Sequence, residues 1–385
     1  MKSAARTTLA ALLAVFAVAA ALGETSAPEP ASATIPFETA GRSTILVPIR
    51  INGSAPFRFV LDSGASLTVI DQARAKDLHL DFGDAVEGHG AGKGTFAYRV
   101  VATPVRLSVG VAEFGCEKLA ALDLTNQLAI LGRPIDGILG YDVFQRYAVE
   151  IDYEARVVRL FEPGSLAAAQ AGVALPLTIT KRLPYVTADL KVKGQPLAKK
   201  TLLVDTGSED AVDDDVVLSS KGPKREVTGG VGLGQEYKVT FGRIASARLG
   251  PYELKNVPSV APGVPLIGSS VLRHFRLTFD YRHGKFYLAR EPVNTLDFSD
   301  SSPGSGLDLR EGKSGLDVHD VIAKSPAEAA GLHAGDAILT IDGTPAADFG
   351  VVRAQQLLDR PGTAYLLVVT LSGSRREVTL RIPAA

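Results

Sequence analysis

Two stretches, F-R-F-V-L-D-S-G-A-S at Phe57–Ser66 and T-L-L-V-D-T-G-S-E-D at Thr201–Asp210, decide the fold of this chain. Each is an apolar run that ends in Asp, a hydroxyl residue and Gly, which predicts a buried strand that stops at a tight turn. A single copy of this pattern is most often an ordinary surface β-turn. Two copies in one chain instead predict an internally duplicated fold.

Three further motifs recur after each copy in the same order. A glycine-rich stretch comes first, and an apolar-apolar-Gly element follows it. The last motif is a pair of strands, and the turn between these strands begins with Asp-Tyr. In the first half these are G-H-G-A-G-K-G from Gly88, D-G-I-L-G-Y-D-V-F from Asp136 and V-E-I-D-Y-E-A-R-V-V-R-L. In the second half they are G-G-V-G-L-G from Gly229, P-L-I-G-S-S-V-L from Pro265 and L-T-F-D-Y-R-H-G-K-F-Y-L. The pattern predicts two equivalent, mainly β halves, at residues 35–165 and 166–290.

Composition excludes several classes of protein. The 385 residues are 46% hydrophobic and 22% charged, as in soluble globular proteins, and this length suggests two or three domains. The 41 Lys and Arg residues balance 42 Asp and Glu, so no basic excess favours nucleic acid as a partner. The single cysteine, Cys116, excludes an internal disulfide and a cysteine-based zinc site. We therefore expect neither a metal nor a cofactor.

The N-terminus has the pattern of an export signal. Lys2 and Arg6 precede an apolar run, Leu9–Leu22, that is shorter than the roughly 20 residues a membrane span needs. A buried helix or an uncleaved membrane anchor are the alternatives. We expect residues 1–23 to be a signal peptide, residues 24–34 a flexible lead-in, and the mature protein to be periplasmic or secreted without a stable membrane span.

The duplicated aspartates, Asp62 and Asp205, suggest a specific chemistry. If the two halves are related by a pseudo-two-fold axis, both carboxyl groups meet at that axis. Two carboxylates about 4 Å apart repel by about 4 kcal/mol at an effective dielectric constant of about 20, so the pair retains one proton. The ionised partner can then deprotonate a water molecule while the protonated partner polarises a carbonyl group of the substrate.

The two motifs resemble those of aspartic peptidases, in particular the bacterial retropepsin-like and pepsin-like group with both halves in one chain. The resemblance implies a bilobal pair of acid-protease-type β-barrels and an endopeptidase that acts on peptides or proteins. It implies Asp62 and Asp205 as catalytic residues. It also implies supporting loops and flaps, in which we expect Ser63, Gly64, Thr206, Gly207 and Ser208 to support the aspartates and Gly90, Gly92, Gly230 and Gly232 to lie in flaps.

The two copies differ beside the aspartates. The residue after the motif glycine is Ala65 in one copy and Ser208 in the other. By the resemblance, the Ser208 hydroxyl donates to Asp205, which predicts that Asp205 is the more readily ionised partner. The second copy continues into E-D-A-V-D-D-D, and we interpret its last three residues, 213–215, as the solvated start of a helix.

The C-terminal segment predicts a separate module. Residues 291–303 are rich in polar and turn residues and predict a linker. After them, S-P-A-E-A-A-G-L, G-D-A-I-L and I-D-G resemble the motifs of a bacterial PDZ domain over residues 304–385, which implies a small α+β fold. A peptide would add as a strand beside the segment that starts at Leu307, with N–H groups near Gly306 receiving its terminal carboxylate. The expected peptide-binding residues are Gly306, Leu307, Asp308 and Leu309.

Three alternatives remain open at this stage. The protein can be a non-catalytic peptide-binding protein with a degenerate protease cleft, in which the PDZ domain performs the recognition. Each half can also pair with the same half of a second chain instead of with its neighbour. A PDZ domain that serves only for packing is a third possibility for the C-terminal module.

Overall fold

A computed structural model describes residues 33–41, 43–89, 95–125, 131, 133–165, 172–229, 237–290, 295–298, 304–322, 325–359, 362–371 and 374–383. The predicted signal peptide, residues 1–23, lies outside these ranges. The protein is mainly β, as its sequence predicts, and the strands within the described ranges form four sheets. No helix among the described residues is long and apolar enough to cross a membrane.

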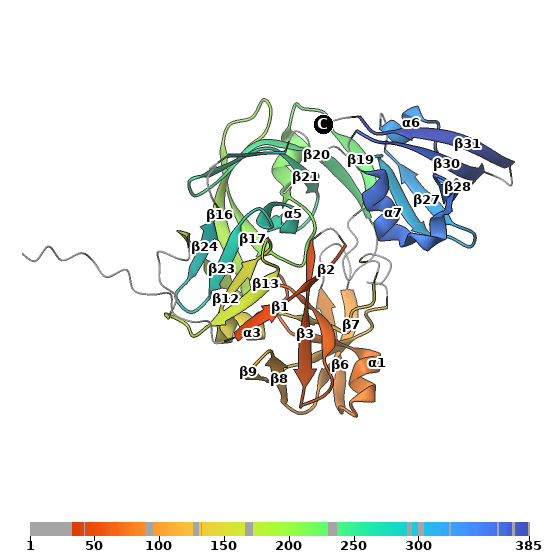
Figure 1. Cartoon of the computed structure of the whole chain (residues 1–385). Coiled ribbons are helices and arrows are strands. Elements are labelled where there is room, and N and C mark those ends of the chain that lie inside the picture. The colour runs from red at the N-terminus through yellow and green to blue at the C-terminus, as the bar shows by residue number, and fades with distance from the viewer. Residues whose placement is uncertain are drawn as a thin grey trace, which may run out of the picture.

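One six-stranded sheet joins the two halves and lies between them (Figure 1). Its order is β1-β13-β12-β23-β24-β14, so three strands from each half contribute. In the middle, β12 and β23 are antiparallel, and Glu150 pairs with Thr278, its equivalent in the repeat. The pairing is therefore symmetric about this position. The strands are β1 (Ala33–Pro36), β12 (Ala148–Asp152), β13 (Val157–Phe161), β14 (Val173–Pro176), β23 (Arg276–Asp280) and β24 (Lys285–Ala289).

Each half also has a sheet of its own, and the two sheets share their central topology. In the first half β4 is parallel to β11, which is antiparallel to β5. In the second half β17 is parallel to β22, which is antiparallel to β18. A short helix follows the apolar-Gly strand in both, α3 after β11 and α5 after β22. The duplication that the motifs predict is thus present in the strand pairing.

The elements of the first half are β2 (Glu38–Ala40), β3 (Thr44–Ile51), β4 (Phe57–Leu61), β5 (Val69–Asp71), α1 (Gln72–Asp77), β6 (Phe82–His89), β7 (Thr95–Val101), β8 (Val105–Val109), β9 (Ala112–Cys116), β10 (Ala120–Leu122), β11 (Gly137–Leu139) and α3 (Tyr141–Arg146). Those of the second half are β15 (Thr178–Thr180), β16 (Leu183–Lys191), β17 (Ala198–Asp205), β18 (Val212–Asp213), η1 (Asp215–Ser219), β19 (Arg225–Gly229), β20 (Tyr237–Leu249), β21 (Tyr252–Ala261), β22 (Leu266–Gly268) and α5 (Ser269–Leu272).

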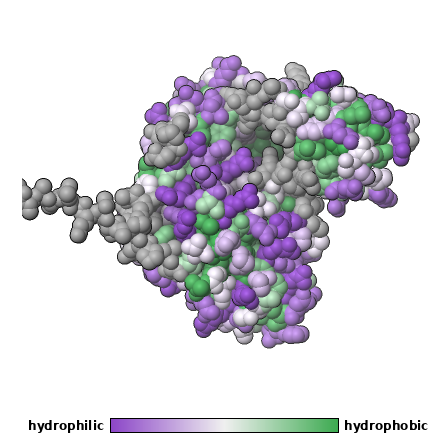
Figure 2. Space-filling model, viewed as in Figure 1, coloured by the Kyte–Doolittle hydropathy of each residue, from purple (hydrophilic) through white to green (hydrophobic). Residues whose placement is uncertain are grey.

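One large hydrophobic core cluster runs through both halves, and a smaller one lies in the first half. The large cluster includes Phe59 in the first half, Phe286 in the second, and Phe144 and Phe279, whose rings pack edge to face at 5.2 Å. All four rings are fully buried, and complete burial of such a side chain contributes about 1.5–3 kcal/mol. The two halves are therefore joined by packing as well as by the shared sheet. Figure 2 shows hydrophilic and hydrophobic residues interspersed over one outer face.

The segment predicted as a linker contains a strand. Residues Thr295–Asp297 form β25, which pairs in parallel with β21 at the edge of the second half's sheet. The following residue, Phe298, is buried, packs against the His274 ring and accepts a hydrogen bond of 2.8 Å from Arg243 Nη1. This part of the segment is anchored to the second half because its backbone completes a sheet, a role that its polar composition does not reveal.

The C-terminal residues form a small α+β unit with its own core. Its sheet has the order β26-β27-β28-β30-β31, and β29 pairs with β28. Leu309, Ile338 and Leu367 belong to a core cluster that contains only residues from this unit. The elements are β26 (Leu307–Glu311), β27 (Leu316–Val321), α6 (Pro326–Ala329), β28 (Ala337–Ile341), β29 (Thr344–Pro345), η2 (Ala346–Asp348), α7 (Gly350–Leu358), β30 (Ala364–Leu371) and β31 (Ser374–Arg381). Helix α7 lies alongside β26, which is one of the two edge strands of this sheet.

Candidate active site

Strand ends place the two aspartates at equivalent positions. Asp62 directly follows β4, and its N–H donates to the carbonyl of Leu139 in β11 at 3.0 Å. Asp205 ends β17 and pairs with Gly268 of β22. In each half the apolar-Gly strand therefore supports the backbone of the aspartate from behind.

A reciprocal set of hydrogen bonds locks the two aspartate loops together. The Ser63 N–H donates to Thr206 Oγ1 and the Thr206 N–H donates to Ser63 Oγ, both at 3.0 Å. Each hydroxyl then donates across to the opposite strand, Ser63 to the Val204 carbonyl at 2.7 Å and Thr206 to the Leu61 carbonyl at 2.9 Å. Both side chains are buried, so water does not compete for these bonds. The lock fixes the position of one loop relative to the other.

The motif glycines allow the aspartates to approach the axis. A Cβ atom on Gly64 would lie 2.5 Å from Cγ of Asp205, and one on Gly207 would lie 2.4 Å from Cγ of Asp62. Only glycine leaves room for the opposite carboxyl group at either position. The two carboxyl groups consequently face each other and form a side-chain hydrogen bond. Because both come from one chain, the pair needs no second copy of the protein.

The environments of the two carboxyl groups differ. Burial, and then the charge of Asp205, raise the pKa of Asp62 well above its ordinary value. Burial also raises the pKa of Asp205, but the hydrogen bond from Asp62 and the N–H groups of Gly207 and Ser208 oppose that rise. The Gly207 and Ser208 bonds to Asp205 Oδ1 measure 2.9 and 3.0 Å. Asp62 Oδ1 also accepts the Gly64 N–H at 2.7 Å, but burial and the charge of Asp205 outweigh this bond, so the coupled pair favours its shared proton on Asp62.

The expected contact of the Ser208 hydroxyl with Asp205 is wrong. Ser208 Oγ donates to Asp210 Oδ2 at 3.2 Å, and only its backbone N–H reaches Asp205. The turn after Asp205 directs the hydroxyl toward the next acidic residue instead. The pKa of Asp205 is raised less than that of Asp62, as the sequence predicts. The donors responsible are the backbone N–H groups and Asp62, and not the Ser208 hydroxyl.

The interpretation of residues 213–215 as a solvated helix start is also wrong in part. Asp214 caps η1 by accepting from the Val216 N–H at 2.8 Å, so a helix does start here. However, Asp213 and Asp214 are buried, at 5% and 4% exposure. Asp214 pairs with Lys200 at 2.9 Å. Burial, followed by the charge of Asp210, raises the pKa of Asp213 well above its ordinary value.

Two residues that were not among the predicted site residues also support the site. Glu209 Oε1 accepts from Ser43 N–H at 3.1 Å and from Thr44 Oγ1 at 3.0 Å, so it connects the second aspartate loop to the first half. The buried Tyr281 hydroxyl lies 3.5 Å from the Ser63 carbonyl, behind the first loop. The repeated Asp-Tyr pair was the signal for Tyr281, and the acidic run after Asp205 was the signal for Glu209.

The predicted flap glycines, Gly90, Gly92, Gly230 and Gly232, lie outside the described residues. The strands that lead to them are described. β6 and β7 are antiparallel up to the pair of His89 with Thr95, and β19 and β20 up to the pair of Gly229 with Tyr237. Each glycine-rich stretch therefore connects the two strands of a hairpin.

The PDZ residues lie at the start of the edge strand. Leu307 and Leu309 are buried under the sheet, whereas Asp308 is partly exposed and lies 3.7 Å from Arg310. Gly306 has a φ of +77° and its carbonyl accepts from Ile322 N–H at 2.8 Å. The Leu307 N–H donates to Ser305 Oγ at 3.2 Å. This donor, which we expected to receive a peptide carboxylate, thus has an acceptor within the chain.

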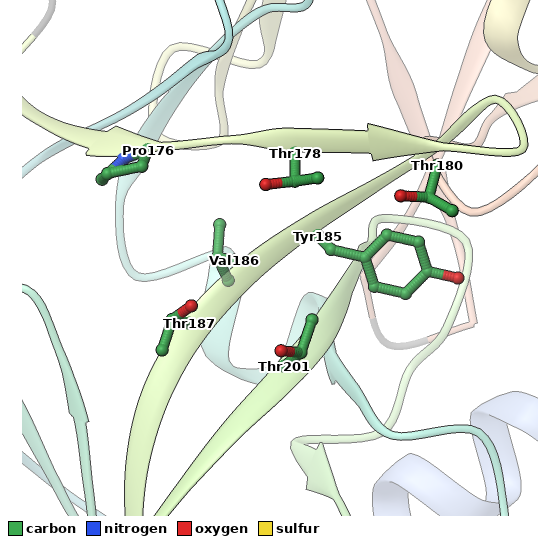
Figure 3. A pocket seen from close by; sticks show the side chains of 7 residues that line it. All are labelled: Pro176, Thr178, Thr180, Tyr185, Val186, Thr187 and Thr201. Atoms are coloured by element: carbon green, nitrogen blue, oxygen red, sulfur yellow. The ribbon is translucent and has the colours of Figure 1, made fainter.

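A pocket of about 350 Å³ lies in the second half, and Figure 3 shows its lining. The lining comes from strands β14 to β17 and contains neither aspartate: Pro176, Thr178, Thr180, Tyr185, Val186, Thr187 and Thr201. It is therefore separate from the dyad. Among the described residues, no group of three or more His, Cys, Asp or Glu side chains is arranged to hold a metal ion.

Two duplicated β halves that each deliver one aspartate to a shared, locked pair of turns form the arrangement that the sequence predicts from its resemblance to aspartic peptidases. Comparison with protein families agrees: residues 47–143 match the aspartyl protease family and residues 295–372 match the PDZ domain. The first match covers only the first copy of the motif. A search of curated proteins finds no match. The chain thus carries an aspartyl protease domain and a C-terminal PDZ domain.

Proposed function

We propose that this protein is an aspartic endopeptidase that hydrolyses peptide bonds with a water molecule activated by Asp62 and Asp205. The contact between the two carboxyl groups across the Ser63–Thr206 lock carries this proposal. A decayed enzyme has little reason to keep both motif glycines, both hydroxyl residues and both aspartates in mutually dependent geometry.

The contacts of each carboxyl group assign its role. Asp205, whose Oδ1 accepts two backbone N–H groups, is the base. It takes a proton from water while the water oxygen attacks the carbonyl carbon of the substrate. Asp62 donates its proton to the carbonyl oxygen, which yields a neutral tetrahedral diol. In the second step the proton on Asp205 moves to the leaving nitrogen, a diol hydroxyl returns its proton to Asp62, and the C–N bond breaks. The dyad ends with one proton, as it began.

Peptide cleavage by the purified chain tests this proposal. The substrate is a diverse peptide pool, and mass spectrometry detects cleavage at several pH values between about 3 and 7. Carboxyl groups with an ordinary pKa of about 4, or with a raised pKa, titrate in this range. We expect cleavage by the wild type and a loss of at least about 1000-fold for Asp62→Asn and for Asp205→Asn, as for removal of a catalytic group.

Asp81→Asn is the matched control, because Asp81 is an exposed aspartate of the first half outside the dyad. It should cleave as the wild type does. Full activity in Asp62→Asn or Asp205→Asn would refute the dyad. If the wild type cleaves no peptide but still binds members of the pool, the protein is instead a peptide-binding protein with a degenerate cleft.

We further propose that the PDZ domain binds peptide segments of substrates or partners, and that the protein is exported to the periplasm or secreted. The edge position of β26 beside α7 supports the first point, since an edge strand can accept a further strand. The N-terminal sequence supports the second. Sequencing the N-terminus of the mature protein from cell fractions tests export, and a mature chain that starts at Met1 would contradict signal cleavage.

A further inference from the structure

The turn before β26 already holds a carboxylate from its own chain. Ser305 donates twice to Asp359 Oδ1, from its N–H at 2.8 Å and from its hydroxyl at 2.9 Å. Ser305 is fully buried, and its Oγ also accepts the Leu307 N–H. The N–H groups on both sides of Gly306 therefore end, directly or through one hydroxyl, on Asp359.

The contact is built into the backbone of the turn. A Cβ atom on Gly304, which has a φ of +61°, would lie 2.0 Å from Asp359 Oδ1, so only glycine permits this approach. Gln355 Nε2 donates to the other oxygen, Oδ2, at 3.0 Å. Both oxygens of the carboxylate thus have donors in place.

The position of Asp359 is otherwise unfavourable. It is the C-cap of α7, where the negative end of the helix dipole disfavours an anionic side chain. The three donors from Ser305 and Gln355 compensate for this cost. They are the kind of donors that a peptide's terminal carboxylate would use in the same turn.

The surrounding charges also disfavour a second anion. Asp308 at the start of β26 pairs in register with Asp320 of β27, so two further acidic residues are close to the turn. Arg310 lies 3.7 Å from Asp308 and offsets part of this charge. An incoming chain terminus would lose its hydration here and meet donors that are already occupied.

We propose that the PDZ domain binds an internal, extended segment of a protein along β26 and discriminates against a free C-terminus, because Asp359 occupies the donors of the carboxylate turn. This proposal rests on the proposed peptide binding by the PDZ domain and names the chemistry of its ligand. An internal segment adds its backbone to the open edge of β26 and brings no terminal charge to the turn.

The test uses the full chain with Asp62→Asn, so that peptides are not consumed, and one random short-peptide library synthesised with a free C-terminal acid or with a C-terminal amide. The chain should capture the amide library at least as well as the acid library. Asp359→Ala frees both Ser305 donors, so it should raise capture of the acid library relative to the amide library by about tenfold, as expected for a charge-assisted pair.

Glu377→Ala is the control, since it removes an exposed acid from β31 at the opposite edge of the sheet and should leave the ratio unchanged. Retained capture of the amide library shows that Asp359→Ala remains folded. Hydrogen exchange locates the binding, because the amides of Leu307–Glu311 should become protected when the amide library is added. A strong preference of the unsubstituted PDZ domain for the acid library, an unchanged ratio in Asp359→Ala, or no protection of β26 would each overturn the proposal. These readouts do not depend on cleavage, so their failure leaves the dyad untouched.

Discussion

Ser63 and Thr206 exchange equal hydrogen bonds across the two halves, each N–H donating to the other residue's hydroxyl at 3.0 Å. The two residues come from repeat copies 143 positions apart, and each hydroxyl also reaches the strand behind its partner. The aspartates are therefore held by a contact that neither half can form alone.

Removal of either hydroxyl should destabilise the protein. Ser63→Ala leaves the buried Thr206 N–H without its acceptor, which costs about 1–3 kcal/mol of unfolding free energy. Ser63→Thr keeps the hydroxyl that the equivalent position uses and serves as the control. Urea unfolding measures both variants, and a stability of Ser63→Ala equal to that of the wild type would show that the lock does not stabilise the fold.

An added methyl group at the motif glycines should separate the dyad. Gly64→Ala and Gly207→Ala each place a Cβ within 2.5 Å of the opposite carboxyl carbon, so the two loops must move apart. A displacement of about 1 Å can reduce the rate about 100-fold, and we expect at least that loss of kcat. Gly115→Ala is the control, because a Cβ there meets no atom within 4 Å. Equal kcat values for all three variants would argue against the close approach.

The pH–rate profile should be bell-shaped, because the dyad is active only while it holds one proton. One limb marks the gain of a second proton and the other marks the loss of the shared proton. Activity falls in acid when Asp205 gains a proton and falls at higher pH when Asp62 loses its proton. Since burial raises the pKa of both groups, both limbs lie above the ordinary carboxyl range. Asp210→Asn removes a negative neighbour that raises the pKa of Asp205, so it should move the acid limb to lower pH.

Ser208→Ala distinguishes the observed contacts from those that the sequence predicts. Because the hydroxyl donates to Asp210 and the backbone N–H serves Asp205, this variant should keep the acid limb within about half a pH unit. If the acid limb of Ser208→Ala instead moved up by a full pH unit or more, the hydroxyl would donate directly to Asp205, as the sequence predicts. Initial rates at saturating and at low substrate separate this effect from a change in binding.

Asp213 should lower stability at neutral pH. Its folded-state pKa is raised, so between the unfolded value of about 3.9 and that raised value the native state binds the extra proton and stability falls as pH rises. Asp213→Asn removes this dependence, and it should be more stable than the wild type by about 1 kcal/mol or more at pH 7. The difference should vanish near pH 4.

Asp214→Asn is the matched comparison for Asp213→Asn. It removes the partner of Lys200 from a buried position, so this neighbouring substitution should lower stability at pH 7. Thermal unfolding across the pH range measures both. A gain in stability for both variants would indicate a general effect of acidic charge and not the individual environments.

The motifs predicted the architecture because they are carried by backbone requirements. Two strands that end in Asp-Ser/Thr-Gly can meet at one axis only if each glycine leaves room for the opposite carboxyl group. The sequence shows this requirement directly, because glycine occupies that position in both motifs. The mainly β class follows in the same way from strand and turn signals, and the PDZ module was predicted from the resemblance of its motifs to those of a known family.

The remaining contacts could not be predicted because they depend on which way a side chain turns. Ser208 has three acidic residues within three positions of it in the sequence, Asp205, Glu209 and Asp210, and only the folded turn selects Asp210 as the acceptor of its hydroxyl. Asp213 and Asp214 read as solvent-exposed until the sheet covers them. Asp359 lies 54 residues from Ser305, and no local pattern marks a carboxylate that acts as the acceptor of a distant turn.

The pairing of β12 with β23 places equivalent residues opposite each other. In a symmetric dimer a strand on the two-fold axis pairs with its own copy, and here Glu150 faces its counterpart Thr278 in that manner. A chain with this pairing has the strand arrangement of a symmetric dimer whose two subunits are joined in one polypeptide. Two halves joined in one chain need not be identical, and where the first has Ser66 and Leu67 the second has Glu209 and Asp210. A substrate groove with two different ends, and hence a preferred direction for the bound chain, is what such an arrangement makes possible.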